Sequence, residues 1–277
     1  MAELALEPRP YPPRGSLRVC TAGSRPLSII HSDDAPRVSV VIAALDEEES
    51  LGYVLPRLPG GLYEVILVDG HSVDRTVEVA RELRHDIRIV EQPGRGKGDA
   101  LRAGFAAARG DIIIAIDADG STDPVEIPAF VGALLAGADY VKGSRFIPGG
   151  GTDDMTLTRK MGNLGLMVLC RVLFGMRFTD LNYGYTGFWM RELSKLDLRS
   201  DGFEIETEMN LRATVGRLKV VEVASFEGAR VAGVAHLRPL QDGWRVLTEI
   251  FRLRFRRTAQ TLHDVGGAYA PEAELPC

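Results

Sequence analysis

Short apolar runs alternate with amphipathic stretches through the first half of the chain. The runs are rich in Val and Ile and too short for helices, which predicts buried strands over Val38–Ala44, Glu64–Val68, Ile87–Glu91 and Asp111–Asp117. In the stretches between them, apolar residues recur at helical spacing, which predicts a helix in each connection. This alternation predicts an α/β fold with a mainly parallel central sheet flanked by helices.

The second half of the chain is less regular. Strands are expected over Asp139–Val141, Gly187–Met190 and Leu218–Phe226, and helices over much of the sequence between them. Three consecutive glycines, Gly149–Gly151, interrupt the pattern. We interpret them as a hinge whose mobility would let a loop close over a ligand.

Length and composition are those of an ordinary globular protein. With 277 residues, 45% of them hydrophobic, the chain can form one large α/β domain or two small ones. Residues 1–36 contain six prolines and little apolar periodicity, which predicts a disordered arm. Folded structure is expected to begin at Val38, and residues 259–277 are expected to form a loose tail.

Charge and cysteine content argue against several classes of function. A net charge of −5 gives no indication of nucleic-acid binding. The three cysteines are scattered, which favours a reducing compartment and excludes a zinc site built from paired cysteines. We find neither a signal peptide nor an apolar run of about 18 residues. We therefore expect a cytoplasmic protein without a membrane span, and the sequence does not indicate an oligomeric state.

Acidic residues follow several of the predicted strands. Asp46, Asp69, Asp117 and Asp119 all fall at carboxyl ends of strands, the edge at which parallel sheets bind ligands. Asp117 and Asp119 precede a turn-forming segment, Gly120–Thr122, so both carboxylates can converge on one point. Such a pair suits a hard divalent cation, Mg²⁺ or Mn²⁺. A helix N-cap with a solvated turn is the alternative interpretation of the pair alone.

The glycine-rich segment Gly94–Gly98 reads GRGKG. It has neither the spacing of a phosphate-binding Walker loop nor that of the GxGxxG dinucleotide fingerprint. A solvated turn would explain it. The functional interpretation is a flexible basic loop that brings Lys97 near a diphosphate.

Two predicted helices combine basic and apolar residues. Residues 244–258 carry five arginines and one glutamate, with Trp244 and Phe251 among the apolar residues at helical spacing. Met155–Phe174 has a similar character. Both fit helices that lie on an anionic membrane surface, and both fit equally well helices that pack on a core with a solvated basic face.

Seven motifs occur in an order that resembles the family 2 glycosyltransferases. They are VSVVIAALDEEE, VDGHSVDRT, GKGDALRAGFAAARGD, DADGSTDP, KGSRF, GFEIETE and RVAG…DGWRVL, over about residues 38–250. Within that family they look most like dolichol-phosphate (polyprenyl-phosphate) mannosyltransferases and glucosyltransferases. The resemblance implies a single nucleotide-sugar-binding domain of the glycosyltransferase A type. We place it at residues 37–258, with a basic amphipathic helix at 242–258.

The resemblance also implies roles for individual residues. The segment that contains Ala43, Asp46 and Glu47 would hold the nucleoside together with Asp69. Asp117 and Asp119 would hold Mg²⁺ or Mn²⁺ on the diphosphate, with Arg230 near the phosphates. Arg145 and Arg159 match basic residues that bind the acceptor phosphate.

The chain departs from the family pattern at three places. The first motif lacks the aromatic residue that could stack on a base, and the second has Gly70-His71-Ser72 after a single aspartate. The last motif has Ala235-His236 where Ser-Lys is usual.

The expected function is metal-dependent, inverting transfer of a hexose from GDP-mannose or UDP-glucose to a polyprenyl phosphate. A lipid phosphate is already ionised, so it would need positioning by Arg145 and Arg159 rather than a strong base. A hydroxyl acceptor would need one, and Asp180 or Glu204 could serve. The alternatives are a soluble acceptor, a haloacid-dehalogenase-type phosphatase with Asp117 as nucleophile, and a non-catalytic module that binds a nucleotide or docks on a membrane. A peripheral contact with the inner face of the membrane would accompany the lipid acceptor.

Overall fold

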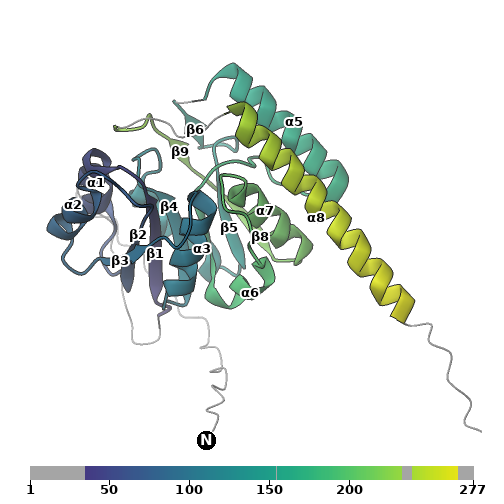
Figure 1. Ribbon diagram of the computed structural model, residues 1–277, viewed down its shortest axis with the longest axis horizontal. Coiled ribbons are helices and arrows are strands. Elements are labelled where there is room, and N and C mark those ends of the chain that lie inside the picture. The colour runs from purple at the N-terminus through teal and green to yellow at the C-terminus, as the bar shows by residue number, and fades with distance from the viewer. Residues whose placement is uncertain (1–34, 154, 233–238, 268–277) are drawn as a thin grey trace, which may run out of the picture.

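A seven-stranded sheet forms the centre of the computed structural model, which describes residues 35–153, 155–232 and 239–267 (Figure 1). The strand order is β3-β2-β1-β4-β7-β5-β8, and only β7 runs antiparallel to its neighbours in this sheet. The strands are β1 Val38–Ala44, β2 Glu64–Asp69, β3 Arg88–Glu91, β4 Ile112–Asp117, β5 Tyr140–Ser144, β7 Thr186–Trp189 and β8 Val220–Ala224. The prediction of a mainly parallel sheet is therefore confirmed.

Helices cover both faces of this sheet. They are α1 Glu48–Val54, α2 Thr76–Leu83, α3 Lys97–Ala107, α4 Ile127–Leu135, α5 Leu157–Phe174, α6 Leu193–Leu196, α7 Ile205–Val215 and α8 Pro239–Gly267, with short 3₁₀ turns at Leu55–Arg57, Pro124–Glu126 and Met190–Glu192. Helix α8 continues beyond residue 258, where we expected it to end, so the first part of the expected loose tail is helical. Most of the expected N-terminal arm lies outside the described residues, as does the rest of that tail.

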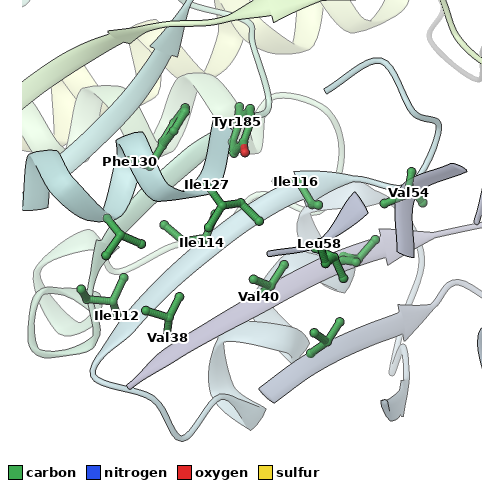
Figure 2. Close-up of a cluster of buried hydrophobic side chains, with 14 of the residues drawn as sticks. Val38, Val40, Val54, Leu58, Ile112, Ile114, Ile116, Ile127, Phe130 and Tyr185 are labelled. Carbon is green, nitrogen blue, oxygen red and sulfur yellow. The ribbon is translucent and has the colours of Figure 1, made fainter. Parts of the chain in front are cut away.

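The core follows from the alternation of side chains along the strands. In β1, Val38, Val40 and Ile42 pack on the face covered by α1 and α4, whereas Val41 packs on the opposite face with α3 and α7. Figure 2 shows the first of these clusters, in which apolar side chains of β1 and β4 meet Ile127 and Phe130 of α4. A third cluster lies between α5, α7 and α8, which pack against one another beside the sheet (Figure 1).

Strand register brings the acidic residues to one edge. Ala43 of β1 pairs with Val68 of β2 and with Asp117 of β4, and Ala44 pairs with Asp69. Because these three parallel strands end at the same level, their terminal carboxylates share one side of the molecule. This confirms the sequence-based expectation of a common carboxyl edge.

Two of the three glycines expected to form a hinge, Gly150 and Gly151, are closely packed. Gly151 begins the short strand β6 (Gly151–Thr152), which pairs with β9 (Phe226–Glu227). Gly149 has a φ of 93°, and a Cβ on Gly150 would lie 2.4 Å from the carbonyl oxygen of Ser144. The glycines are therefore required by a left-handed backbone and a close approach of chains. Among the described residues, no helix combines the length and the apolar character needed to cross a membrane.

Candidate active site

The turn after β4 holds two carboxylates in defined positions. Asp117 is the last residue of β4, and Asp119 accepts a hydrogen bond from the Ser121 backbone N–H at 2.9 Å. Gly120 has a φ of 76°, and a Cβ there would lie 2.5 Å from Val231. Only glycine fits this turn without strain, so both aspartates come directly before the position where the chain reverses.

Asp117 is paired with a lysine. The Nζ atom of Lys97, the first residue of α3, lies 2.6 Å from Asp117 Oδ1 and 2.6 Å from Glu206 Oε1 of α7. The Lys97 and Glu206 side chains are only 12% and 11% exposed, and that of Asp117 is 24% exposed. Burial alone would lower the pKa of Lys97, but the two carboxylates outweigh it and raise this pKa above its usual value. Lys97 is therefore a charged bridge between α7 and the end of β4.

Asp119 is paired with an arginine in a similar way. Arg230 Nη2 lies 2.9 Å from Asp119 Oδ2, and Arg230 Nη1 lies 3.0 Å from Glu47 Oε1. The segment that carries this arginine is joined to the turn by its backbone: Gly228 N–H donates to Ser121 at 2.9 Å, and Val231 N–H donates to Asp119 at 3.0 Å. Burial raises the pKa of Glu47 despite the guanidinium beside it.

The residues expected to hold the nucleoside lie close together, and two of them already accept hydrogen bonds from backbone N–H groups. Asp69 Oδ1 accepts from the Ser72 backbone N–H at 3.3 Å. Asp46 has a φ of 55°, and its Oδ1 accepts from the Val73 N–H at 2.8 Å. These bonds join the loops after β1 and β2. The register places Ala43 between Val68 and Asp117, so the segment from Ala43 to Glu47 connects this end of the site to Arg230.

The glycine-rich segment is more closely packed than the expected flexible loop. Gly96 has a φ of 96°, and a Cβ on Gly98 would lie 2.2 Å from the carbonyl oxygen of Ser200. The Gly94 N–H donates to Asp99 at 2.7 Å, and Gln92 donates to the Gly96 carbonyl at 2.9 Å. This packing fixes the start of α3 and with it the position of Lys97 beside Asp117, and its expected contact with a diphosphate stays a prediction.

Arg145 is buried in an ion-pair network. Its Nε and Nη2 atoms donate to Asp180 at 2.7 and 2.8 Å, and its Nη1 donates to Glu227 at 2.9 Å. The side chains of Arg145 and Asp180 are 2% and 0% exposed. Burial would raise the pKa of Asp180, but Arg145 outweighs it and lowers this pKa. The guanidinium is thus directed at protein carboxylates, and contact with an acceptor phosphate stays a prediction.

Arg159 and the two candidate bases occupy separate places. Arg159 lies half-buried in the first turn of α5, where its N–H donates to the capping hydroxyl of Thr156 at 3.3 Å. Asp180 is engaged by Arg145. Glu204 accepts from the Gly202 N–H at 3.1 Å. An acceptor site at any of these residues remains a prediction.

The site suits a divalent metal that is coordinated partly by the protein and partly by a bound ligand. In the part of the chain that the structure describes, no group of three or more His, Cys, Asp or Glu side chains could hold a metal by itself. Asp117 and Asp119 are hard oxygen donors, and Mg²⁺ is commonly held by one or two carboxylates plus substrate phosphates. These two residues therefore fit a metal whose other ligands come from a diphosphate and water.

Comparison with known proteins decides the family. The family model described as "Glycosyl transferase family 2" matches residues 39–198, more than half of the chain, including β4 and its acidic turn. The chain belongs to glycosyl transferase family 2. The phosphatase alternative is thereby set aside, and the fold is that of a glycosyltransferase A domain.

The proteins that the chain resembles differ in what their names say they act on. A dolichol-phosphate mannosyltransferase of Pyrococcus furiosus is 30% identical over 78% of this chain and 63% of its own length. An undecaprenyl-phosphate mannosyltransferase of Micrococcus luteus is 33% identical over 68% of this chain and 82% of its own. The chain thus spans less than two thirds of the Pyrococcus protein. A structure of glucosyl-3-phosphoglycerate synthase from Mycobacterium tuberculosis with Mn²⁺ and UDP-glucose is 25% identical, covers 79% of each chain and has a TM-score of 0.62.

Two residues of this glycosyltransferase site were missed in the sequence. Glu206 reaches Lys97, whereas the glutamate of the GFEIETE motif considered from the sequence was Glu204, as a candidate base. Glu208 is buried and pairs with Arg212 at 3.0 Å. Gly184 lies against the pair: a Cβ there would be 2.7 Å from Asp117 Oδ2 and 2.8 Å from Lys97 Nζ. The motif GFEIETE contained the first signal, but only tertiary contact shows which glutamate is used.

Proposed function

We propose that this protein is a metal-dependent, inverting glycosyltransferase that moves a hexose from a nucleotide diphosphate sugar to a polyprenyl phosphate. The observation that carries the proposal is the pairing of Asp117 and Asp119 with Lys97 and Arg230 at the carboxyl edge of the sheet. Two carboxylates beside two cations match the needs of a diphosphate leaving group that develops negative charge.

On the donor side, Asp117 and Asp119 would hold Mg²⁺ or Mn²⁺. When bound, the metal would stabilise charge on the leaving diphosphate. Lys97 and Arg230 lie beside these carboxylates and would bind the phosphate oxygens, and Asp69 would orient the base. Mn²⁺ with UDP-glucose, or Mg²⁺ with UDP, occurs in structures of the mycobacterial synthase, which supports both the metal and the donor class.

On the acceptor side, two neighbouring helices support a lipid. Five apolar residues of α5 that recur at helical spacing are 52% to 77% exposed: Leu157, Met161, Leu164, Val168 and Val172. We call this row the α5 stripe. On α8, Trp244 and Phe255 are 71% and 68% exposed. Apolar rows of this kind mark interaction surfaces, and exposed basic residues such as Lys160 and Arg171 complement an anionic bilayer.

The lipid phosphate would reach the site from the end of α5. Arg159 lies in the first turn of this helix, and the chain that precedes the helix leads back to Arg145. A phosphate monoester is ionised at neutral pH, so its oxygen can attack the sugar without a protein base. Attack opposite the departing diphosphate would invert the configuration at the sugar carbon. The two mannosyltransferases named for lipid phosphates support this acceptor.

A soluble phosphorylated acceptor is the second candidate. It is favoured by the likeness to glucosyl-3-phosphoglycerate synthase, whose fold the chain shares over 79% of both lengths. In that case the α5 stripe would have no part in catalysis.

A transfer assay separates these candidates. The full chain would receive labelled GDP-mannose or UDP-glucose, Mg²⁺ or Mn²⁺, and either undecaprenyl phosphate in detergent or 3-phosphoglycerate. Lipid-bound label that requires metal, and that is lost in Asp119→Asn, supports the lipid acceptor. The matched control is Asp86→Asn, which removes an exposed carboxylate just before β3, at the opposite edge of the sheet.

Other outcomes have defined meanings. Label in phosphoglycerate alone would favour the second candidate. Absence of transfer to either acceptor, together with no metal-dependent hydrolysis of the donor, would contradict a glycosyltransferase with these donors.

A further inference from the structure

Both carboxylates of the acidic turn are paired with a cation of the protein. Two relays lie side by side: Glu206–Lys97–Asp117 and Glu47–Arg230–Asp119. In each relay, one cation is shared between a turn aspartate and a second, more deeply buried glutamate. The four contacts have lengths of 2.6, 2.6, 3.0 and 2.9 Å.

These cations cover oxygen atoms that a metal would need. Lys97 contacts Asp117 Oδ1, and Arg230 contacts Asp119 Oδ2. A divalent ion that bound alone through these atoms would have to displace the two cations and would then lie beside two partly buried positive charges. Each displaced cation would be left with one carboxylate in place of two, Glu206 for Lys97 and Glu47 for Arg230.

A diphosphate removes this conflict. Its oxygens can accept hydrogen bonds from Lys97 and Arg230. Each cation then keeps a counter-ion while the aspartates become available to the metal. Glu206 and Glu47 would keep hold of the two side chains during the exchange, because each already contacts the same nitrogen-bearing group.

We infer that Lys97 and Arg230 couple metal binding to diphosphate binding: each neutralises a turn aspartate in the empty site and a phosphate in the loaded one. Glu206 and Glu47 act as positioning residues for this exchange. The ligand classes rest on the proposed function, and the exchange of partners by Lys97 and Arg230 is the new element. By linkage, the nucleotide strengthens metal binding by the same factor by which the metal strengthens nucleotide binding.

The inference predicts opposite changes in two affinities. In Lys97→Met the competitor for Asp117 is gone, so Mn²⁺ alone should bind several-fold more tightly than to the wild type. The same variant should bind GDP or UDP several-fold more weakly, because a phosphate ligand is lost. A residue with a merely structural role would weaken both. Arg230→Met should show the same pattern at Asp119. This second variant keeps the test valid if Lys97→Met fails to fold.

Binding is measured without turnover. Electron paramagnetic resonance of free Mn²⁺ gives metal binding to the full chain, with and without GDP or UDP, after correction for Mn²⁺ held by free nucleotide. Arg95→Met is the matched control, since it removes an exposed positive charge two residues from Lys97 and should change neither affinity. Glu206→Gln should weaken binding of Mn²⁺ alone, because Lys97 then has only Asp117 as its partner.

The outcomes distinguish this inference from the proposed function. If wild type binds Mn²⁺ and nucleotide but both Met variants bind Mn²⁺ alone no more tightly, the coupling role is wrong while the donor site stands. If neither GDP nor UDP binds wild type with Mn²⁺, the proposed donor class and the inference both fail. Opposite shifts without transfer to any acceptor would support the inference and leave the acceptor to be replaced.

Discussion

The carboxyl edge of the sheet and the pair of helices α5 and α8 differ in how their side chains are satisfied. At the edge, charged groups from distant parts of the sequence are buried and matched, as Lys97 is with Asp117 and Glu206. On the α5 stripe, apolar side chains such as Leu157 and Val172 are more than three-quarters exposed. In the first region buried charges are paired with one another, whereas the second exposes apolar surface to water. We therefore expect catalysis at the carboxyl edge of the sheet. At α5 and α8 we expect association with a membrane or with another molecule.

The largest effect is expected from Asp119→Asn. The substitution removes a proposed metal ligand and leaves Arg230 with Glu47 alone, so charge on the leaving diphosphate would lose support. Removal of one such stabilising group typically costs about 100-fold to 1,000-fold in rate. Steady-state measurement of kcat/KM for donor consumption checks this, with Asp86→Asn as control. A loss below tenfold would show that Asp119 is not part of the metal site.

The next largest effect concerns stability rather than rate. Arg145 and Asp180 form a buried pair with bonds of 2.7 and 2.8 Å, and removal of one partner of such a pair typically costs about 3 kcal/mol or more. We expect Arg145→Met and Asp180→Asn each to lower the free energy of unfolding by that amount at pH 7, measured by urea denaturation. An unchanged midpoint in both variants would contradict a structural role for the pair.

Low pH should remove the stabilisation that the Arg145–Asp180 pair provides. The pKa of Asp180 is lowered in the folded protein, so its stabilisation is fully present above the ordinary aspartate pKa of about 4. It is lost as the pH falls through the folded value, where the carboxylate is protonated. The stability difference between wild type and Asp180→Asn should therefore be constant from pH 7 to about 5 and shrink below about 4. Urea midpoints over this range test the sign.

A smaller effect is expected on the helices. A double variant, Met161→Glu with Val168→Glu, places two charges on the α5 stripe, where the wild-type residues are 62% and 53% exposed. Binding to vesicles that contain anionic lipid should fall by about tenfold or more, because apolar area and attraction are both lost. Co-sedimentation measures this, and transfer to a water-soluble acceptor should be unchanged.

Leu83→Glu is the control for this variant. Leu83 is an apolar residue at the end of α2 that is 44% exposed, outside both basic helices. If it reduces vesicle binding as much as the double variant does, the α5 stripe has no special role.

The smallest effect is expected from Lys160→Gln. A basic residue near an anionic surface contributes about 1 kcal/mol, so affinity for anionic vesicles should fall roughly fivefold, with no change on neutral vesicles. Lys195→Gln, at an exposed lysine of α6, should have no effect on either. Equal losses on neutral vesicles would indicate an apolar rather than an electrostatic contribution.

Local sequence was sufficient for the strands and for the acidic turn. The apolar run before Asp117 allowed β4 to be placed within one residue, and Gly120 indicated the turn that follows. The direction of a strand was not encoded locally. A strand was expected over Gly187–Met190 and is found at Thr186–Trp189, but its antiparallel position between β4 and β5 depends on the long connection before it. The end of α8 was missed for the opposite reason, since nothing in residues 259–267 interrupts a helix strongly.

Partners across the chain were beyond prediction. Lys97 and Glu206 are 109 residues apart, and Arg230 and Glu47 are 183 apart. The motif KGSRF reads the same whether its arginine faces a ligand or a buried carboxylate. Only the fold shows that Arg145 is held by Asp180 and Glu227, which is why its expected contact with the acceptor needs direct measurement.

The segment that joins Glu227 to Arg230 has a consequence for kinetic work. Glu227 holds Arg145, on the side where the acceptor is proposed, and Arg230 holds Asp119 on the donor side. Backbone hydrogen bonds fasten the same segment to Ser121 and Asp119. The two substrates therefore share one short piece of backbone, and a substitution within it should alter both Michaelis constants at once. An altered KM for one substrate, measured in such a variant, would not locate that substrate's binding site.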